Sequence, residues 1–112
     1  MKTINIKGKE YVPVSERVKE FHELTSEIVE KGISTEIISN TDKLVTVKAS
    51  ITLGESTYTG HSQASWEKGM MKDVALEVAE TSAIGRALGF AGFGIVDGIA
   101  TADEINKTEF EI

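Results

Sequence analysis

The sequence contains no cysteine, one proline, and no apolar run approaching the roughly 18 to 20 residues needed to cross a bilayer. Without cysteine, neither a disulfide framework nor a thiolate metal site is possible, and nothing argues for an oxidising compartment. The first seven residues also lack the apolar core of a signal peptide. We therefore expect a protein of the reducing cytosol that is neither exported nor membrane-spanning.

Length and composition indicate one compact domain. A chain of 112 residues has room for a single core, and its 40% apolar and 27% charged residues are typical of a globular protein rather than a disordered one. We expect one domain over residues 1–112, which ends in a short acidic segment, residues 101–112.

Positive charge is scarce in the C-terminal part. The formal net charge is −6, which by itself argues against a nucleic-acid ligand, because phosphate contacts need lysine and arginine. Residues 1–32 carry six basic and six acidic side chains, and residues 33–72 carry four of each. Residues 73–112 have only Arg86 and Lys107 against eight acidic side chains. Because the acidity is confined to this part, the rest can still present a local basic face.

Apolar spacing predicts a first helix over residues 16–31. An extended segment, residues 4–14, precedes it and is ended by Pro13. Ser15 stands where an N-cap is expected, and Gly32 where a helix typically terminates. The apolar positions at helical spacing are Val18, Phe21, Leu24, Ile28 and Val29.

From Ile33 the apolar period changes to two, which predicts three strands. They span residues 33–39, 44–53 and 56–66, joined by a turn at 40–43 and a short hairpin turn at 54–55. The middle strand alternates most clearly, with Val45, Val47, Ala49, Ile51 and Leu53 on one face.

A second helix is predicted over residues 74–90, with Asp73 as its N-cap. Its many small residues allow close approach to a sheet or to another helix, and close packing is expected to offset the cost of Gly85, about 1 kcal/mol relative to alanine. The glycine-rich stretch 90–99 is expected to return as an extended segment. The fold class is therefore α+β: an antiparallel three-stranded meander between two helices, which cover one sheet face and leave the other partly open.

Catalysis finds little support in the sequence. His22 and His61 have no metal-ligand spacing, and the known nucleophile, zinc and calcium motifs are absent. The glycines at 89, 92 and 94 follow a helix instead of opening one after a strand, so they do not indicate dinucleotide binding. We expect no enzyme activity, no cofactor and no metal.

Nucleic-acid binding has more support. Single strands are held by cations along the backbone and by aromatic faces on which bases stack. The middle of the chain has both kinds of residue: Lys43, Lys48, Tyr58, His61, Trp66, Lys68 and Lys72.

Two interpretations of these residues remain open. Tyr58 and Trp66 share a strand face with Ala64, which is the core face in one interpretation and a stacking surface in the other. Lys48, His61 and Gln63 belong to polar strand faces and are safer candidates for the solvent side. A solvated sheet face with scattered lysines is the alternative to a binding site.

Four segments of the sequence resemble a known family. They are Ile6–Val18, Glu80–Phe90, Gly94-Ile95 and Ile99–Glu104, and together they are similar to small single-stranded DNA-binding proteins of tailed bacteriophages. Such proteins act beside recombination functions without catalysing a reaction, and the resemblance implies a variant of the oligonucleotide-binding (OB) barrel. The order of helix, meander and helix also resembles Rad52-type annealing proteins.

The resemblance leads to a functional expectation. We expect a non-catalytic, sequence-tolerant single-stranded DNA-binding protein of phage replication or recombination, active as a homo-oligomer in the bacterial host cytoplasm. Arg86, inside the most specific matching segment, clamps a phosphate in one interpretation and pairs with Glu80, Asp97 or another acid in the other. Residues 108–112 resemble a very short version of the acidic tails that recruit partner enzymes, against the simpler interpretation of a frayed terminus.

Two rival functions follow from the same features. An annealing protein would also pair complementary strands. A protein-interaction module of the recombination complex would never contact DNA, and the acidic charge favours this rival slightly.

Overall fold

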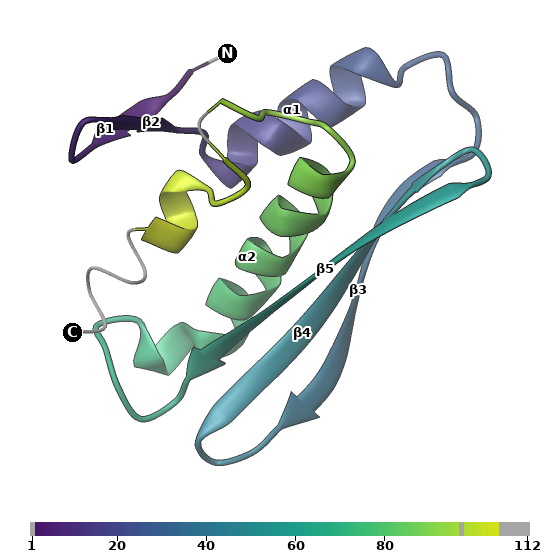
Figure 1. Ribbon diagram of the computed structural model, residues 1–112. Coiled ribbons are helices and arrows are strands. Elements are labelled where there is room, and N and C mark those ends of the chain that lie inside the picture. Colours follow the sequence, from purple (N-terminus) through teal and green to yellow (C-terminus); the bar gives the residue numbers. More distant parts are fainter. Residues whose placement is uncertain (1, 97, 106–112) are drawn as a thin grey trace.

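A three-stranded antiparallel sheet is the centre of the structure, a computed structural model that describes residues 2–96 and 98–105. The strands β3 (Lys31–Asn40), β4 (Leu44–Leu53) and β5 (Ser56–Ser65) lie in that order, so β4 is central (Figure 1). The predicted bounds of β4 are confirmed, and those of its neighbours differ by one or two residues. In β3 the register with β4 shifts between Ile37 and Ser39, which marks a bulge.

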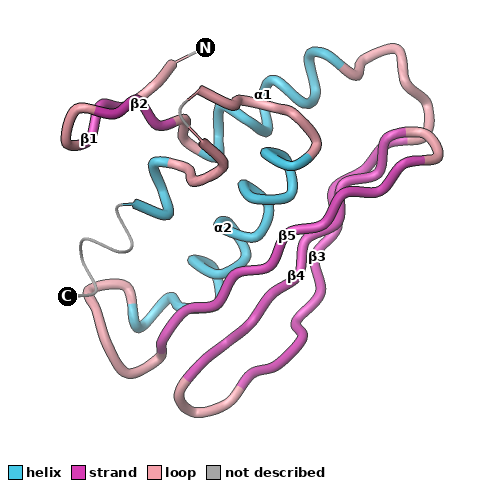
Figure 2. Tube along the Cα trace, viewed as in Figure 1, coloured by secondary structure: helices cyan, strands magenta, loops and turns pink. Residues whose placement is uncertain are grey.

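The core lies between this sheet and helix α2 (Ala75–Phe90), which crosses β4 and β5 (Figure 2). The alternating face of β4 is buried as predicted, and the small residues of α2 pack onto it. At Gly60 of β5 a Cβ atom would lie 2.5 Å from the backbone nitrogen of Ala87. Small residues thus bring helix and sheet close together, and none of the described helices lies on the opposite sheet face. The buried core cluster consists of Phe21, Val45, Val47, Ala49, Ile51, Ala64, Ala75, Ala79, Ala83, Ala87, Leu88 and Phe93.

The α+β class and the helix–meander–helix order are therefore confirmed, and the strands described here do not close into a barrel. No described helix has the length and apolar character that a membrane span requires.

Helix α1 (Val14–Leu24) is shorter than predicted, and its start is capped differently. Pro13 occupies the N-cap position, and Ser15 lies inside the helix. The carboxylate of Asp103, distant in sequence, accepts a hydrogen bond from the backbone nitrogen of Val14 at 2.7 Å. A side chain from the other end of the chain thus performs the N-cap role that we had assigned to Ser15.

The prediction that α1 continues to residue 31 was wrong. Thr25 ends the helix, with its hydroxyl bonded to the carbonyl of Phe21. Leu24 and Val29, counted as part of the apolar stripe, are 67% and 95% exposed. The helical spacing of apolar residues therefore extends beyond the part of the chain that packs on the core. Lys31 is the first residue of β3 instead of the last residue of the helix.

The N-terminal segment, the start of α2 and the segment after α2 differ in detail from the predictions. The N-terminal segment is a hairpin of β1 (Ile4–Ile6) and β2 (Lys9–Tyr11), not a single extended entry. A 3-10 turn, η1 (Lys72–Val74), precedes α2, and Asp73 lies within it without capping α2. The described part of 90–99 contains turns instead of the predicted extended return, and residues 102–105 form a short helical turn. Asp97 and the tail 106–112 lie outside the described residues.

Candidate nucleic-acid interface

Two turns come together at one end of the sheet and bring several of the predicted site residues with them. We call this region, residues 41–43 and 66–72, the turn end (Figure 1). The backbone nitrogen of Trp66 donates to the carbonyl of Lys43 at 2.9 Å, which joins the β3–β4 turn to the start of the β5–α2 segment. Lys43 and Trp66, 23 positions apart in sequence, are thereby held next to each other.

Side-chain hydroxyls give both turns a defined shape. The hydroxyl of Thr41 accepts from the backbone nitrogens of Lys43 and Leu44, each at 3.1 Å. The hydroxyl of Ser65 accepts from the backbone nitrogens of Glu67 and Lys68, each at 3.0 Å. Because these bonds form within the protein, the backbone at Lys43 and Lys68 takes its shape without a ligand.

Trp66 is held on the core side of the sheet but is only half-buried. Its indole Nε1 donates to the side-chain oxygen of Asn40 at 2.9 Å. The one polar atom of the ring is therefore satisfied by the protein. Tyr58 lies opposite Ile51 on the same core face, toward the other end of β5, so the structure does not bring it to the turn end.

The charges of the turn end are mixed. Lys43, Lys68 and Lys72 are exposed, but Asp42 and Glu67 lie in the same turns and Asp73 follows at once. None of the three lysines forms an ion pair with another described residue. The region therefore offers exposed lysines on the same two segments as Trp66, without a dense positive field.

Lys48 and His61 form a separate group on the helix-free face of the sheet. They are direct cross-strand partners, and Lys48 also faces Glu36 on β3, so one row carries a carboxylate, an ammonium and an imidazole. The structure thus divides the predicted site residues between two surfaces. The surrounding positions of this open face are mainly hydroxyl side chains: Ser34, Thr46, Ser50, Thr52, Thr57 and Thr59.

Arg86 lies away from both groups. Its guanidinium is 3.5 Å from the carboxylate of Glu104 and sits over the ring of Phe90 at 5.6 Å from the centroid. Of the two acids proposed as partners, Glu80 instead accepts from the hydroxyl of Thr35 on β3 at 2.7 Å. These contacts support the structural interpretation of Arg86, with Glu104 as the acid, over a phosphate clamp.

The residue that sequence reasoning missed is Arg17. It is fully buried in α1 and donates to four backbone carbonyls at 2.7 to 3.4 Å: that of Gly85 in α2 and those of Gly94, Gly98 and Ile99 in the glycine-rich stretch 90–99. Burial lowers the pKa of its guanidinium, against the opposing influence of the nearby acids Glu104, Asp103 and Glu20. Arg17 is a structural tie between α1 and α2.

Three glycines make room for this arginine and its surroundings. A Cβ at Gly89 would lie 2.7 Å from Nη1 of Arg17, and one at Gly94 would lie 2.6 Å from its Cγ. A Cβ at Gly85 would meet the side chains of Val14 and Thr101 at 2.7 and 2.9 Å. The close packing expected at Gly85 is confirmed. The only sequence feature that could have indicated the role of Arg17 is an arginine in a predicted helix together with a distant glycine-rich stretch.

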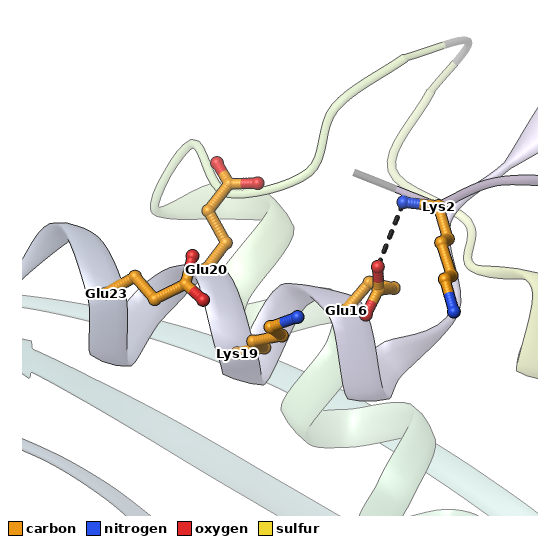
Figure 3. Close-up of a pocket in the computed structure, with 5 residues that line it drawn as sticks. All are labelled: Lys2, Glu16, Lys19, Glu20 and Glu23. Atoms are coloured by element: carbon orange, nitrogen blue, oxygen red, sulfur yellow. Dashed lines mark hydrogen bonds between the residues drawn. The ribbon is translucent and has the colours of Figure 1, made fainter.

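A shallow hollow of about 390 Å³ lies on α1 and has a different character (Figure 3). Its lining residues are Lys2, Glu16, Lys19, Glu20 and Glu23. The backbone nitrogen of Lys2 donates to the carboxylate of Glu16 at 2.9 Å, and carboxylates outnumber ammonium groups, so this surface is unsuited to a polyanion. Within residues 2–96 and 98–105, no three histidine, aspartate or glutamate side chains gather as metal ligands do.

Comparison with known proteins gives one match. The family model described as Slr1353 N-terminal dsRNA-binding domain-like matches residues 21–91, more than half of the chain. The matched region runs from the end of α1 through the meander and α2. No curated protein and no solved structure matches the chain. The match agrees with the coarse prediction of a nucleic-acid-binding module and does not distinguish single-stranded DNA or a phage role.

Proposed function

The chain belongs to the Slr1353 N-terminal dsRNA-binding domain-like family, and from this premise we propose that it is a non-catalytic nucleic-acid-binding module whose ligand is single-stranded DNA. The observation that carries the proposal is the backbone hydrogen bond between Trp66 and Lys43. It joins the turn that carries Lys43 to the segment that begins with the only tryptophan of the sequence and also carries Lys68 and Lys72.

The chemistry of the turn end suits a flexible, unpaired strand. Exposed lysines contact successive phosphates without reading sequence, while the exposed part of the Trp66 indole offers one base an apolar surface. The bond from its Nε1 to Asn40 fixes the ring and removes a donor that base stacking does not need. Single-stranded DNA also agrees with the resemblance of Glu80–Phe90 to phage proteins of this kind.

The mixed charge of the turn end sets an expectation for affinity. Three lysines next to three acids give weak attraction at long range, so binding depends on direct contacts at short range. We expect modest affinity for one copy, which falls further as salt rises. We place this activity in DNA replication or recombination of a phage, in the cytoplasm of its bacterial host.

Double-stranded RNA is the second candidate, favoured by the description of the family. Duplex RNA is recognised by shape and by contacts to phosphates and 2′-hydroxyls, so it requires no base stacking. The same exposed lysines would serve such a ligand, but Trp66 would then contribute little.

Fluorescence of the single tryptophan separates these ligands. Trp66 emission is followed while the protein is titrated with oligo-dT, duplex RNA or duplex DNA at several salt concentrations, and binding is measured in parallel by anisotropy of labelled strands. Single-stranded DNA is expected to quench Trp66 and to bind more weakly at high salt. Tighter binding of duplex RNA, with unchanged emission, would establish the second candidate instead.

Two controls test the remaining alternatives. The variant Trp66→Phe should lose part of its affinity for oligo-dT and little for duplex RNA. A strand-annealing assay with complementary oligonucleotides distinguishes an annealing protein from one that only binds. Absence of binding to every nucleic acid would leave the protein-interaction module.

A further inference from the structure

Strand β3 is an edge of the sheet whose helix side is largely uncovered. Helix α2 packs on β4 and β5 and makes only marginal contact with β3, which lies at the outer margin in Figure 1. Residues 34–40 are all exposed, and Ile37 and Ile38 keep 52% and 51% of their surface accessible. Among residues 2–96 and 98–105, no strand pairs with the outer edge of β3, so its outward backbone N–H and C=O groups have no strand partner there.

The regular part of this strand has a symmetric pattern about Thr35. From Ile33 to Ile37 it reads Ile-Ser-Thr-Glu-Ile, with isoleucine at both ends and polar residues between. Ile33 and Ile37 face the helix side, because they pair with the core positions Ile51 and Val47 of β4. The register shift after Ile37 ends this regular part.

We propose that two copies of the chain form a two-fold symmetric dimer by antiparallel pairing of their β3 edges, with Thr35 at the axis. In this register Ile33 of one copy lies opposite Ile37 of the other, and Ser34 lies opposite Glu36. The two-fold axis generates each pair twice. Within each isoleucine pair the two side chains shield each other from water on the uncovered helix side of the sheet.

Charge and closure favour a second copy as the occupant of this edge. The register keeps the two Glu36 carboxylates away from direct opposition, where like charges would destabilise the pair. The bulge after Ile37 limits pairing to the symmetric five residues. A two-fold interface uses the same patch on both copies and closes at two, whereas pairing of β3 with the β5 edge of another copy would grow without limit.

Dimerisation would place the two turn ends at opposite ends of a six-stranded sheet. Thr35 and Asn40 are five residues apart, so at roughly 3.3 Å per residue the two turn ends lie about 33 Å apart along the strands. A long single strand that reaches both would be held by two modest sites at once and so bind more tightly.

Cysteine cross-linking tests the register directly, because the natural chain has no cysteine. Residues opposite each other in antiparallel strands have Cα atoms about 4.5 or 5.5 Å apart, within the range of a disulfide. Thr35→Cys should therefore cross-link to its own copy under mild oxidation. Ser34→Cys and Glu36→Cys should cross-link when mixed, and these two variants leave the Thr35 bond to Glu80 intact. Thr57→Cys, on the other edge strand, should not cross-link.

Sedimentation equilibrium without nucleic acid tests the interface independently of the proposed function. The wild type should show a monomer–dimer equilibrium, and Ile37→Lys should raise the dissociation constant about tenfold or more. Val29→Lys is the matched control, since Val29 is exposed and lies outside β3. Three results would overturn the proposed dimer through β3. They are a monomer at all concentrations, oligomers that keep growing beyond the dimer, and a dimer whose dissociation constant Ile37→Lys leaves unchanged. None of these results bears on binding of an oligonucleotide by one copy.

Discussion

The turn end and the buried surroundings of Arg17 use cations in opposite ways. Arg17 has no exposed surface, and its guanidinium is satisfied by four backbone carbonyls. Lys43, Lys68 and Lys72 are exposed and have no ion-pair partner among the described residues. A buried cation is removed from water, so its hydrogen-bond donors need acceptors within the protein. An exposed cation is solvated and remains available to a ligand. Burial and partners, not residue type, therefore separate the structural cations from the candidate binding ones.

The largest effect is expected from removing the buried cation. Arg17→Met keeps an unbranched side chain but leaves the carbonyls of Gly85 and Ile99 without their short hydrogen bonds to the guanidinium. Because each buried acceptor left unpaired costs about 1–3 kcal/mol, the free energy of unfolding should fall by about 3 kcal/mol or more. Urea unfolding followed by circular dichroism measures this change.

Arg86→Met provides the matched control for that experiment. Its ion pair with Glu104 is 3.5 Å long, and the two side chains are 36% and 16% exposed, so the loss should be about 1–2 kcal/mol, smaller than for Arg17→Met. Equal losses for the two arginine variants would contradict the distinction between them.

The next effect concerns the close contact of helix and sheet. Gly60→Ala would place a Cβ 2.5 Å from the nitrogen of Ala87 and 2.9 Å from the carbonyl oxygen of Ala83, both backbone atoms. Overpacking of this kind should cost about 2–3 kcal/mol in the free energy of unfolding. Gly32→Ala, where nothing lies within 4 Å of the added atom, is the control and should change stability little.

Removing the exposed cations should affect binding and spare stability. In the triple variant Lys43→Gln, Lys68→Gln and Lys72→Gln, affinity for oligo-dT should fall about 10- to 100-fold, or about 1.4–2.7 kcal/mol. The slope of log affinity against log salt should fall by about 0.7 for each phosphate that no longer binds a lysine.

A second triple variant, Lys2→Gln, Lys9→Gln and Lys19→Gln, carries the same change in net charge elsewhere on the molecule. Its affinity for oligo-dT should stay close to that of the wild type. If both triple variants weakened binding equally, the effect would be one of overall charge, and the turn end would lose its special role.

The smallest effect is expected at the contact that orients the indole. Asn40→Ala removes the acceptor of the Trp66 Nε1 hydrogen bond, which should cost about 0.5–1.5 kcal/mol of stability. Trp66 emission should shift as the ring loses its fixed position, and quenching by oligo-dT should weaken. Ser39→Ala, at the neighbouring exposed position, should leave both measurements unchanged.

Local pattern was sufficient for the meander but insufficient for α1. The alternation of Val45, Val47, Ala49 and Ile51 predicted β4 with its bounds because one strand face is buried along its whole length. In α1 the apolar spacing continued through Val29, although that side chain is 95% exposed. Periodicity reports which residues share a face, and it does not report where the surface that covers this face ends.

For the candidate site, the sequence placed the lysines and aromatics in or beside the meander, and it left open which face each aromatic takes. The structure assigned Tyr58 and Trp66 to the core side and divided Lys48 and His61 from the turn end. Arg17 had no local signal, because its partners lie 68 to 82 positions away.

The strand alternation, the presence of two helices and the confinement of negative charge to the C-terminal part depend on residues close along the chain, so they can be predicted from local pattern. Local pattern does not specify which sheet face is covered, which cations are buried or which loops meet at the turn end. Those features depend on long-range packing: α2 lies over β4 and β5, and the backbone of Trp66 reaches Lys43. Burial and hydrogen-bond partners arise from that packing, and they determine whether a charged side chain stabilises the fold or remains available to a ligand.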